Sequence, residues 1–153
     1  MGRTSKGEKL MAVIIGLSDN RTVMCDLDDV SFKKAKSLAL LALEHFKLEG
    51  FIILKSSHKH YHVVFDKPKR WTEVLSIIAW IGIMAKNENV WKWVCMQSIK
   101  KFCTLRVGPK PDPEGLKPSP KIVYRYGSQN RQIKWFLSMR KSVLRIVKRL
   151  SVG

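Results

Sequence analysis

The order in which two hydrophobic periodicities follow one another constrains the fold of this chain more than any other feature. Apolar residues recur at every second position in Thr22–Leu27 and in His60–Phe65, a pattern typical of half-buried strands. They recur at helical spacing in Ser31–Glu49 and again from Arg70 to about Lys86. Each helical pattern follows strand patterns, so we expect a domain in which helices pack against a sheet.

The remaining segments extend this pattern. Met11–Leu17 and Thr22–Leu27 flank a polar tetrapeptide, which predicts a β-hairpin. Residues 90–99 fit either a short helix or a strand, and residues 108–120 contain five of the six prolines, which predicts an extended loop. Further strands are expected at 51–56, 102–107 and 121–126, and a strongly basic amphipathic helix at 128–150.

The order strand, helix, two strands, helix, strand is that of the ferredoxin-like or RNA-recognition-motif (RRM-like) topology. The sequence therefore predicts an α+β fold: an antiparallel sheet with helices on one face and the other face open. We expect a flexible basic arm at 1–10, an RRM-like core at 11–127 and a basic helix at 128–153 packed on that core. Ser31 is expected to cap the first helix, and Gly50 to end it.

The charge of the chain favours a polyanionic partner. There are 29 Lys and Arg against 12 Asp and Glu, a formal net charge of +17 and a pI near 10.1. Each cation placed on a phosphate releases a counterion, so nucleic acid is the first candidate, with DNA ranked ahead of RNA, and an anionic membrane surface is the second.

The location is expected to be intracellular, in the cytoplasm. No stretch reaches the ~18 uncharged apolar residues that a membrane span needs, and the first residues lack the apolar core of a signal peptide. Cys25, Cys95 and Cys103 are odd in number and scattered in apolar segments, which favours buried free thiols over a disulfide framework or a zinc site.

Three acids within four positions, Asp26, Asp28 and Asp29, stand out in so basic a chain. Strand alternation places Asp26 and Asp28 on one face, and it places His60, His62 and Asp66 on one face of a later strand, with Thr104 and Arg106 facing outward on another. Two close carboxylates repel each other unless a cation lies between them, so a divalent ion, Mg²⁺ or Mn²⁺, is the expected cofactor. Two simpler alternatives remain open: Asp28 and Asp29 would cap the helix, and the histidines would lie on a solvated sheet face.

Two segments, VMCDLDD and ILKSSHKHYHVVF one helix later, resemble the catalytic core of archaeo-eukaryotic primase-polymerases. The resemblance implies metal-dependent nucleotidyl transfer, with Asp26 and Asp28 as metal ligands and His62 contacting a nucleoside triphosphate near Lys55, Ser56 and Ser57. TLRVGPKPDPEGLKP is similar to the arginine-proline-glycine loop of that family, where Arg106 would meet phosphate.

The resemblance covers roughly residues 22–118 and departs from the family at one point. The family's third carboxylate precedes the arginine loop, whereas this chain has no Asp between Asp66 and Asp112, and Glu88 lies in a polar turn. A minimal or altered relative, of the kind that archaeal mobile elements encode, is implied.

A rival interpretation uses the same strand. His60-Tyr61-His62 fits the histidine-hydrophobic-histidine motif of rolling-circle replication endonucleases, in which His60 and His62 would bind the metal and Tyr124 or Tyr126 would attack DNA. The discriminating feature is the nucleophile, because this chemistry needs the tyrosine, whereas primase-like chemistry needs the two acids.

A third interpretation has no catalysis: the chain would be a basic nucleic-acid-binding module. Its lysine-rich loops and C-terminal helix supply the phosphate contacts, and Trp91, Trp93 or Tyr126 would stack on unpaired bases. The expected nucleic-acid contacts are Lys67, Lys69, Arg70, Lys100, Lys101, Lys110, Lys117, Lys121, Arg125, Arg131, Lys134, Arg140, Lys141 and Arg145. Nucleic-acid binding is common to all three interpretations.

Overall fold

A computed structural model describes residues 15–152, so the expected arm at 1–10 and the start of the first expected strand lie outside the described residues. The elements are β1 (Gly16–Asp19), β2 (Met24–Asp28), α1 (Phe32–Phe46), β3 (Gly50–Ser57), β4 (His60–Phe65), α2 (Trp71–Ala85), α3 (Glu88–Lys100), β5 (Cys103–Arg106), β6 (Lys110–Asp112), β7 (Gly115–Lys117), β8 (Lys121–Gly127) and α4 (Gln132–Val152).

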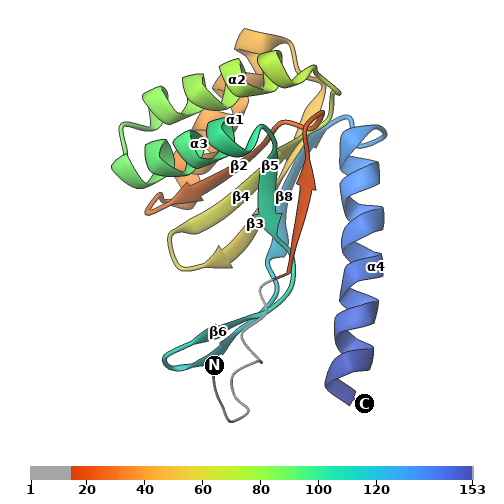
Figure 1. The fold of residues 1–153 in the computed structure, drawn as a ribbon. Helices are drawn as coiled ribbons and strands as arrows, with labels where there is room; N and C mark the ends of the chain where they lie inside the picture. The colour runs from red at the N-terminus through yellow and green to blue at the C-terminus, as the bar shows by residue number, and fades with distance from the viewer. Residues whose placement is uncertain (1–14, 153) are drawn as a thin grey trace.

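The fold is α+β and its sheets are antiparallel, as the sequence predicts (Figure 1). A four-stranded sheet has the order β2-β4-β3-β8, and β1 pairs with β5 in a second sheet whose strand β5 lies beside β2. The succession β2-α1-β3-β4-α2-α3-β5 is consistent with the ferredoxin-like β-α-β-β-α-β order, with two helices in the second helical position.

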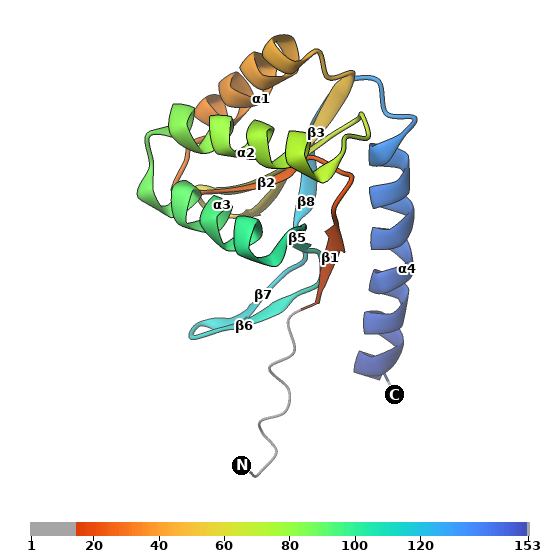
Figure 2. The ribbon, with the colours of Figure 1, turned by 45° about the horizontal axis from the view of Figure 1, so that its top comes forward.

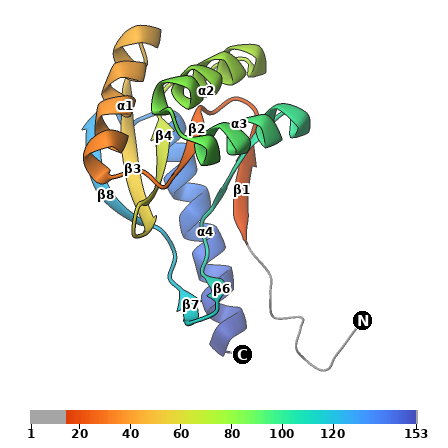
Figure 3. The ribbon, with the colours of Figure 1, turned by 90° about the vertical axis from the view of Figure 1, so that its left-hand side faces the viewer.

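The two faces of the sheet are covered differently. Helices α1, α2 and α3 lie together on one side, and α4 stands apart from them along the other (Figures 1 and 3). The α1 side receives every second residue of each strand, including Cys25, Val63 and Phe51, all at most 1% exposed. On the other side α4 packs against β4 and β1 and buries its own Ile133 and Phe136. The second face is therefore open only beyond the part that α4 covers.

The expected hairpin between the first two strands is wrong. Strand β1 pairs with β5, in register Asp19 with Cys103, and β2 pairs with β4 (Figure 2). The connecting turn is local: the Asp19 carboxylate accepts hydrogen bonds from the Arg21 backbone N–H and the Thr22 hydroxyl. A polar turn thus reverses the chain without forcing its two strands to pair, because β5 enters between them.

The end of the first helix also differs from the prediction. Ser31 caps α1 as expected, but the helix ends at Phe46, and Lys47 takes the left-handed conformation with φ 54°. Gly50 instead begins β3, where an added Cβ would lie 2.1 Å from the Ser128 carbonyl oxygen. Gly50 is therefore needed for the close approach of two backbones and not for a helix cap.

Two other segments are better defined than the sequence indicates. Residues 90–99 lie within helix α3, which Asn87 caps by accepting from the Asn89 and Val90 backbone N–H groups. The proline-rich segment contains the β6–β7 hairpin, with Lys110 opposite Lys117. Proline has no backbone N–H to donate to a neighbouring strand. The hairpin forms nevertheless, because a ladder of three residues in each strand needs few such donors.

The helices and the cysteines can be compared with the sequence-based expectations for membrane spans and for buried free thiols. None of the helices within residues 15–152 has the length and apolar character needed to cross a membrane. All three cysteines are free, and Cys25 and Cys103 are buried, but Cys95 is exposed, contrary to expectation. Burial raises the pKa of Cys103 to about 12 and that of Cys25 well above its usual value, so both thiols stay protonated.

Candidate functional site

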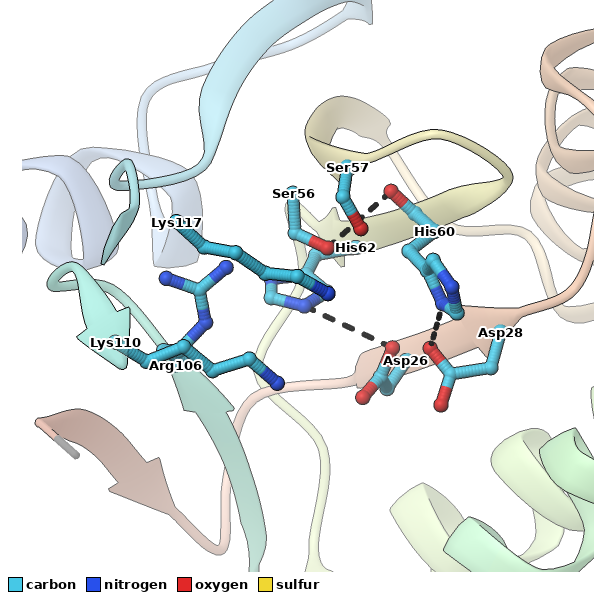
Figure 4. A pocket seen from close by; sticks show the side chains of 9 residues that line it. All are labelled: Asp26, Asp28, Ser56, Ser57, His60, His62, Arg106, Lys110 and Lys117. Carbon is cyan, nitrogen blue, oxygen red and sulfur yellow. Dashed lines mark hydrogen bonds and ion pairs between the residues drawn. The ribbon is translucent and has the colours of Figure 1, made fainter. Parts of the chain in front are cut away.

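A polar cavity of about 210 Å³ lies on the face of the sheet that α4 leaves open. It is formed by β2, the end of β3, the start of β4, the end of β5 and the base of the β6–β7 hairpin (Figure 4). Its lining residues are Asp26, Asp28, Ser56, Ser57, His60, His62, Arg106, Lys110 and Lys117. All nine were singled out from the sequence, seven as catalytic, metal-binding or nucleotide-binding residues and Lys110 and Lys117 as nucleic-acid contacts.

Strand register brings the acids and histidines together. In the β2–β4 pair, Asp26 lies opposite His62 and Asp28 opposite His60. The His60 Nδ1 lies 2.7 Å from the Asp28 Oδ1, and the His62 Nε2 lies 3.7 Å from the Asp26 Oδ1. The first pair is a hydrogen bond, whereas the second is too long for one. Asp28 is therefore oriented by its histidine, and Asp26 is not.

The carboxylate of Asp26 is electrostatically unsatisfied. Among residues 15–152, no hydrogen-bond partner reaches its buried Oδ1. Burial raises the pKa of Asp26 well above its usual value, and the neighbouring Asp28 carboxylate raises it further, whereas Lys110 and Arg106 act in the opposite direction. The charged form of Asp26 would gain from a cation placed between the two carboxylates.

His62 is held as neutral imidazole. Its side chain is 5% exposed, and burial, followed by the charge of Arg106, lowers its pKa to about 4. At neutral pH the ring therefore carries one N–H donor and one acceptor nitrogen, and adds no charge to the cavity.

The opposite wall of the cavity is cationic (Figure 4). The Arg106 guanidinium donates to the Gly108 and Pro118 carbonyl oxygens, which bracket the β6–β7 hairpin. Lys110 and Lys117 lie opposite each other in the register of that hairpin, next to the two carbonyl groups that Arg106 contacts. Arg106 thus fixes the hairpin that presents the two lysines, in addition to lining the cavity itself.

Lys117, like Lys110, was expected only as a nucleic-acid contact, and sequence reasoning placed neither beside the acids and histidines. The run Pro-Asp-Pro-Glu-Gly at residues 111–115 carries turn chemistry, and recognising it as a hairpin would have paired Lys117 with Lys110. Lys55, in contrast, was expected near the phosphates but does not line the cavity. In the strand register Lys55 lies opposite Tyr61, on the other face, and the β-bulge after it lets both Ser56 and Ser57 line the cavity.

Asp66 does not belong to the open face, contrary to expectation. It is fully buried and accepts hydrogen bonds from the Ser128 hydroxyl and the backbone N–H groups of Asn130, Arg131 and Ile133, at 2.7–3.1 Å. It therefore satisfies the N-terminal end of α4, where unpaired N–H groups and the helix dipole favour a carboxylate.

The capping alternative for Asp28 and Asp29 is also wrong. Ser31 is the N-cap of α1, and the first turn of that helix contains no acid. Asp29 takes the left-handed conformation with φ 58°, and the Asn87 side chain donates to the backbone carbonyls of both Asp28 and Asp29. The carboxylate of Asp28 is thus left to the cavity.

The residues present fit a divalent cation that shares its coordination with a substrate. Within the described part of the chain, no three His, Cys, Asp or Glu side chains are gathered to hold a metal by themselves. The expected set of Asp26, Asp28 and His60 is therefore not a ready-made three-ligand site, because His60 is hydrogen-bonded to Asp28. Mg²⁺ commonly binds one or two protein carboxylates together with substrate phosphates. This cavity supplies two carboxylates, and a substrate would supply the phosphates.

The tyrosines lie away from this cavity. None of the chain's three tyrosines, all within the described residues, lines it. Tyr61 and Tyr124 both contact Phe32 of α1, and Tyr126 stacks on Phe51, so all three belong to the opposite face of the sheet. The cavity therefore lacks the tyrosine nucleophile that the endonuclease interpretation needs.

Most of the other expected nucleic-acid contacts fall into three places. Lys67, Lys69 and Arg70 lie in the β4–α2 connection, and Arg131 and Lys134 lie at the start of α4, where Arg131 also pairs with Glu49. Arg140, Lys141 and Arg145 lie further along α4 and line a second cavity with Arg125 and Lys148. Of the expected nucleic-acid contacts, Lys110 and Lys117 line the first cavity.

Comparisons with protein-family models, with curated proteins and with solved structures return no match to this chain.

Proposed function

We propose that the protein binds a nucleoside triphosphate with a divalent cation and transfers the nucleotide to a nucleic-acid strand, as a minimal relative of the primase-polymerases. The observation that carries this proposal is that one cavity has two different walls: the neighbouring carboxyl groups of Asp26 and Asp28 face three cations, Arg106, Lys110 and Lys117. A cation–triphosphate pair complements both walls, because the metal meets the acids and the phosphates meet the basic residues.

Each residue has a separate task in this proposal. Asp26 and Asp28 would hold Mg²⁺ or Mn²⁺, which, when bound, neutralises charge developing on the phosphates. Lys110 and Lys117 would receive the phosphate oxygens, and the Ser57 hydroxyl would donate a hydrogen bond beside them, whereas the Ser56 hydroxyl donates to the His60 carbonyl oxygen at 3.3 Å.

His62 and Arg106 complete the cavity without taking up the metal. The neutral His62 ring supplies a donor whose protonation does not change near pH 7. Arg106 holds the lysine hairpin in place through its two carbonyl contacts.

The reaction balances without a further reagent. A strand 3′-hydroxyl attacks the α-phosphorus, a new phosphodiester bond forms, the bond to the β-phosphate breaks, and pyrophosphate leaves as the hydroxyl proton passes to water.

The test is calorimetric titration of a nucleoside triphosphate with Mn²⁺, followed by primer extension. We expect Asp26→Asn/Asp28→Asn to abolish Mn²⁺-dependent nucleotide binding and extension. The matched control is Asp29→Asn/Asp112→Asn, which makes the same charge change at two acids outside the cavity. Asn also tolerates the left-handed backbone of position 29.

Equal nucleotide affinity in the two double variants would overturn the nucleotide site. Binding without extension, in the wild type, would leave a nucleotide-binding protein and overturn the transfer step.

A further inference from the structure

A groove between β8 and α4, about 460 Å³ in volume, lies on the same side of the sheet as the cavity but is formed by different residues. Its lining consists of Ile122 and Arg125 from β8, and Leu137, Arg140, Lys141, Leu144, Arg145 and Lys148 from α4. No acid of the described chain lines it. Five of its eight residues are cations, which makes it a more uniformly positive site than the cavity.

Exposure divides the groove into a floor and two rims. Ile122, Leu137 and Leu144 are half-buried, whereas Arg125 on β8 and the α4 residues Lys141 and Arg145 are exposed. The cations therefore come from both elements that border the groove, with apolar side chains between them. A ligand with a flat anionic surface would contact only the rims. The shape of the groove therefore favours a narrow ligand that reaches the floor.

Arg140 joins the two walls. Its Nη2 donates to the Pro120 carbonyl oxygen, which precedes β8, at 2.9 Å. Its buried Nε has no hydrogen-bond partner among residues 15–152. A buried guanidinium nitrogen with nothing to donate to is costly unless an acceptor, such as a phosphate oxygen, completes the site.

We propose that this groove binds single-stranded nucleic acid, with phosphates on its rims and unpaired bases on its apolar floor. Each nucleotide of a single strand carries one negative phosphate and a base with an accessible ring face. The phosphate suits the cationic rims of the groove, and the ring face suits its apolar floor. In a duplex the ring faces are covered by stacking and pairing, and only the phosphates are offered. This proposal rests on the proposed function, which requires a nucleic-acid strand as the acceptor of the nucleotide. It adds that the strand is single and that the groove between β8 and α4 holds it.

The length of the groove sets the size of the ligand. Residues 137–148 of α4 span about 16 Å at about 1.5 Å per residue. A stacked strand rises about 3.4 Å per nucleotide along its axis, so about four or five nucleotides fit.

The experiment measures binding of a fluorescent 12-nucleotide single strand, and of the matching duplex, to the full-length protein across a range of salt concentrations. We expect the single strand to bind more tightly than the duplex. In Lys141→Gln/Arg145→Gln, its affinity should fall by at least about tenfold and the log–log salt slope by about two. The control Lys33→Gln/Lys92→Gln makes the same charge change on exposed faces of α1 and α3 and should change affinity by less than about threefold.

A second variant separates the floor from the charge. Leu144→Trp fills the groove without altering net charge, and we expect weaker single-strand binding with an unchanged salt slope. Thermal unfolding of each variant checks that the fold is kept.

Three outcomes would overturn the proposal: equal losses in the groove and control variants, duplex binding as tight as single-strand binding, or groove variants that lose phosphatidylserine vesicle binding and keep the oligonucleotide. Nucleotide binding with Mn²⁺, measured in the same variants, should be unchanged. If the wild type binds the strand in this groove but no nucleotide, the groove stands and the proposed function fails.

Discussion

Asp66 and Asp26 are both acids that strand alternation predicts on one open sheet face, yet the structure treats them in opposite ways. Asp66 is fully buried and accepts four hydrogen bonds at the start of α4. Asp26 keeps an oxygen without a hydrogen-bond partner among the described residues, beside a second carboxylate. The first is satisfied by the fold, and the second is left to be satisfied by a ligand.

The difference teaches how to separate structural acids from functional ones in this chain. A carboxylate whose lone pairs are filled by backbone N–H groups stabilises the protein in its charged form. A carboxylate that lies near a like charge and lacks hydrogen-bond donors destabilises the protein in its charged form. Such a group is tolerated where it serves to bind a ligand. Substitution of the two acids should therefore change stability in opposite directions.

The largest effect is expected at Asp66. Asp66→Ala leaves three backbone N–H groups and a hydroxyl unpaired inside the protein, and should lower the free energy of unfolding by about 3–5 kcal/mol. Urea denaturation at pH 7 measures it, with Asp112→Ala as the control for loss of an acid on the hairpin. A loss no larger than that of the control would break the comparison, because Asp66 would then be as dispensable as a surface acid.

The next effect is the pH dependence caused by His62. Its pKa is about 4 in the folded protein against an ordinary 6.5, so between these values the unfolded chain binds a proton that the folded chain does not. The associated stability is fully present above pH 6.5 and is lost as the pH falls to 4, in total about 3 kcal/mol. Urea denaturation of Asp26→Asn should follow this curve, and Asp26→Asn/His62→Gln should not.

The Asp26→Asn background is needed because Asp26 has the opposite dependence. Its raised pKa means that the folded chain holds a proton more tightly than the unfolded chain, so its effect is to add stability as the pH falls. Identical pH curves for the single and double variants would show that His62 titrates normally and that the cavity is wetter than its geometry indicates.

The smallest effect is expected for Asp26→Asn at pH 7. Removal of the like charge beside Asp28 should raise the free energy of unfolding by up to about 1 kcal/mol. Asp29→Asn, next in sequence but outside the cavity, should change it by less than about 0.5 kcal/mol. A clear loss of stability in Asp26→Asn would mean that the fold, and not a ligand, satisfies this carboxylate.

Most of the site could be predicted because strand alternation is local. Period-two patterns placed Asp26 with Asp28 and His60 with His62, and pairing of β2 with β4 only had to bring two faces together. The same alternation failed for Asp66, because α4 covers the end of that face, and a pattern within one strand carries no information about a helix 60 residues later. The place of Lys55 near the phosphates was implied by the family resemblance and not by alternation, and the strand register puts it opposite Tyr61, on the other face.

Sequence alone determined the α+β class, the approximate span of most helices and strands outside β1, α3 and the β6–β7 hairpin, and the concentration of acids and histidines in two of the strands. These features depend on residues within a few positions of one another, where side-chain periodicity and capping act. Only the tertiary structure decided that β5 enters between β1 and β2, that Arg106 clamps a hairpin presenting Lys110 and Lys117, and that Asp66 belongs to α4. Each of these depends on contacts between distant segments, whose free energy comes from burial and pairing after the chain has folded.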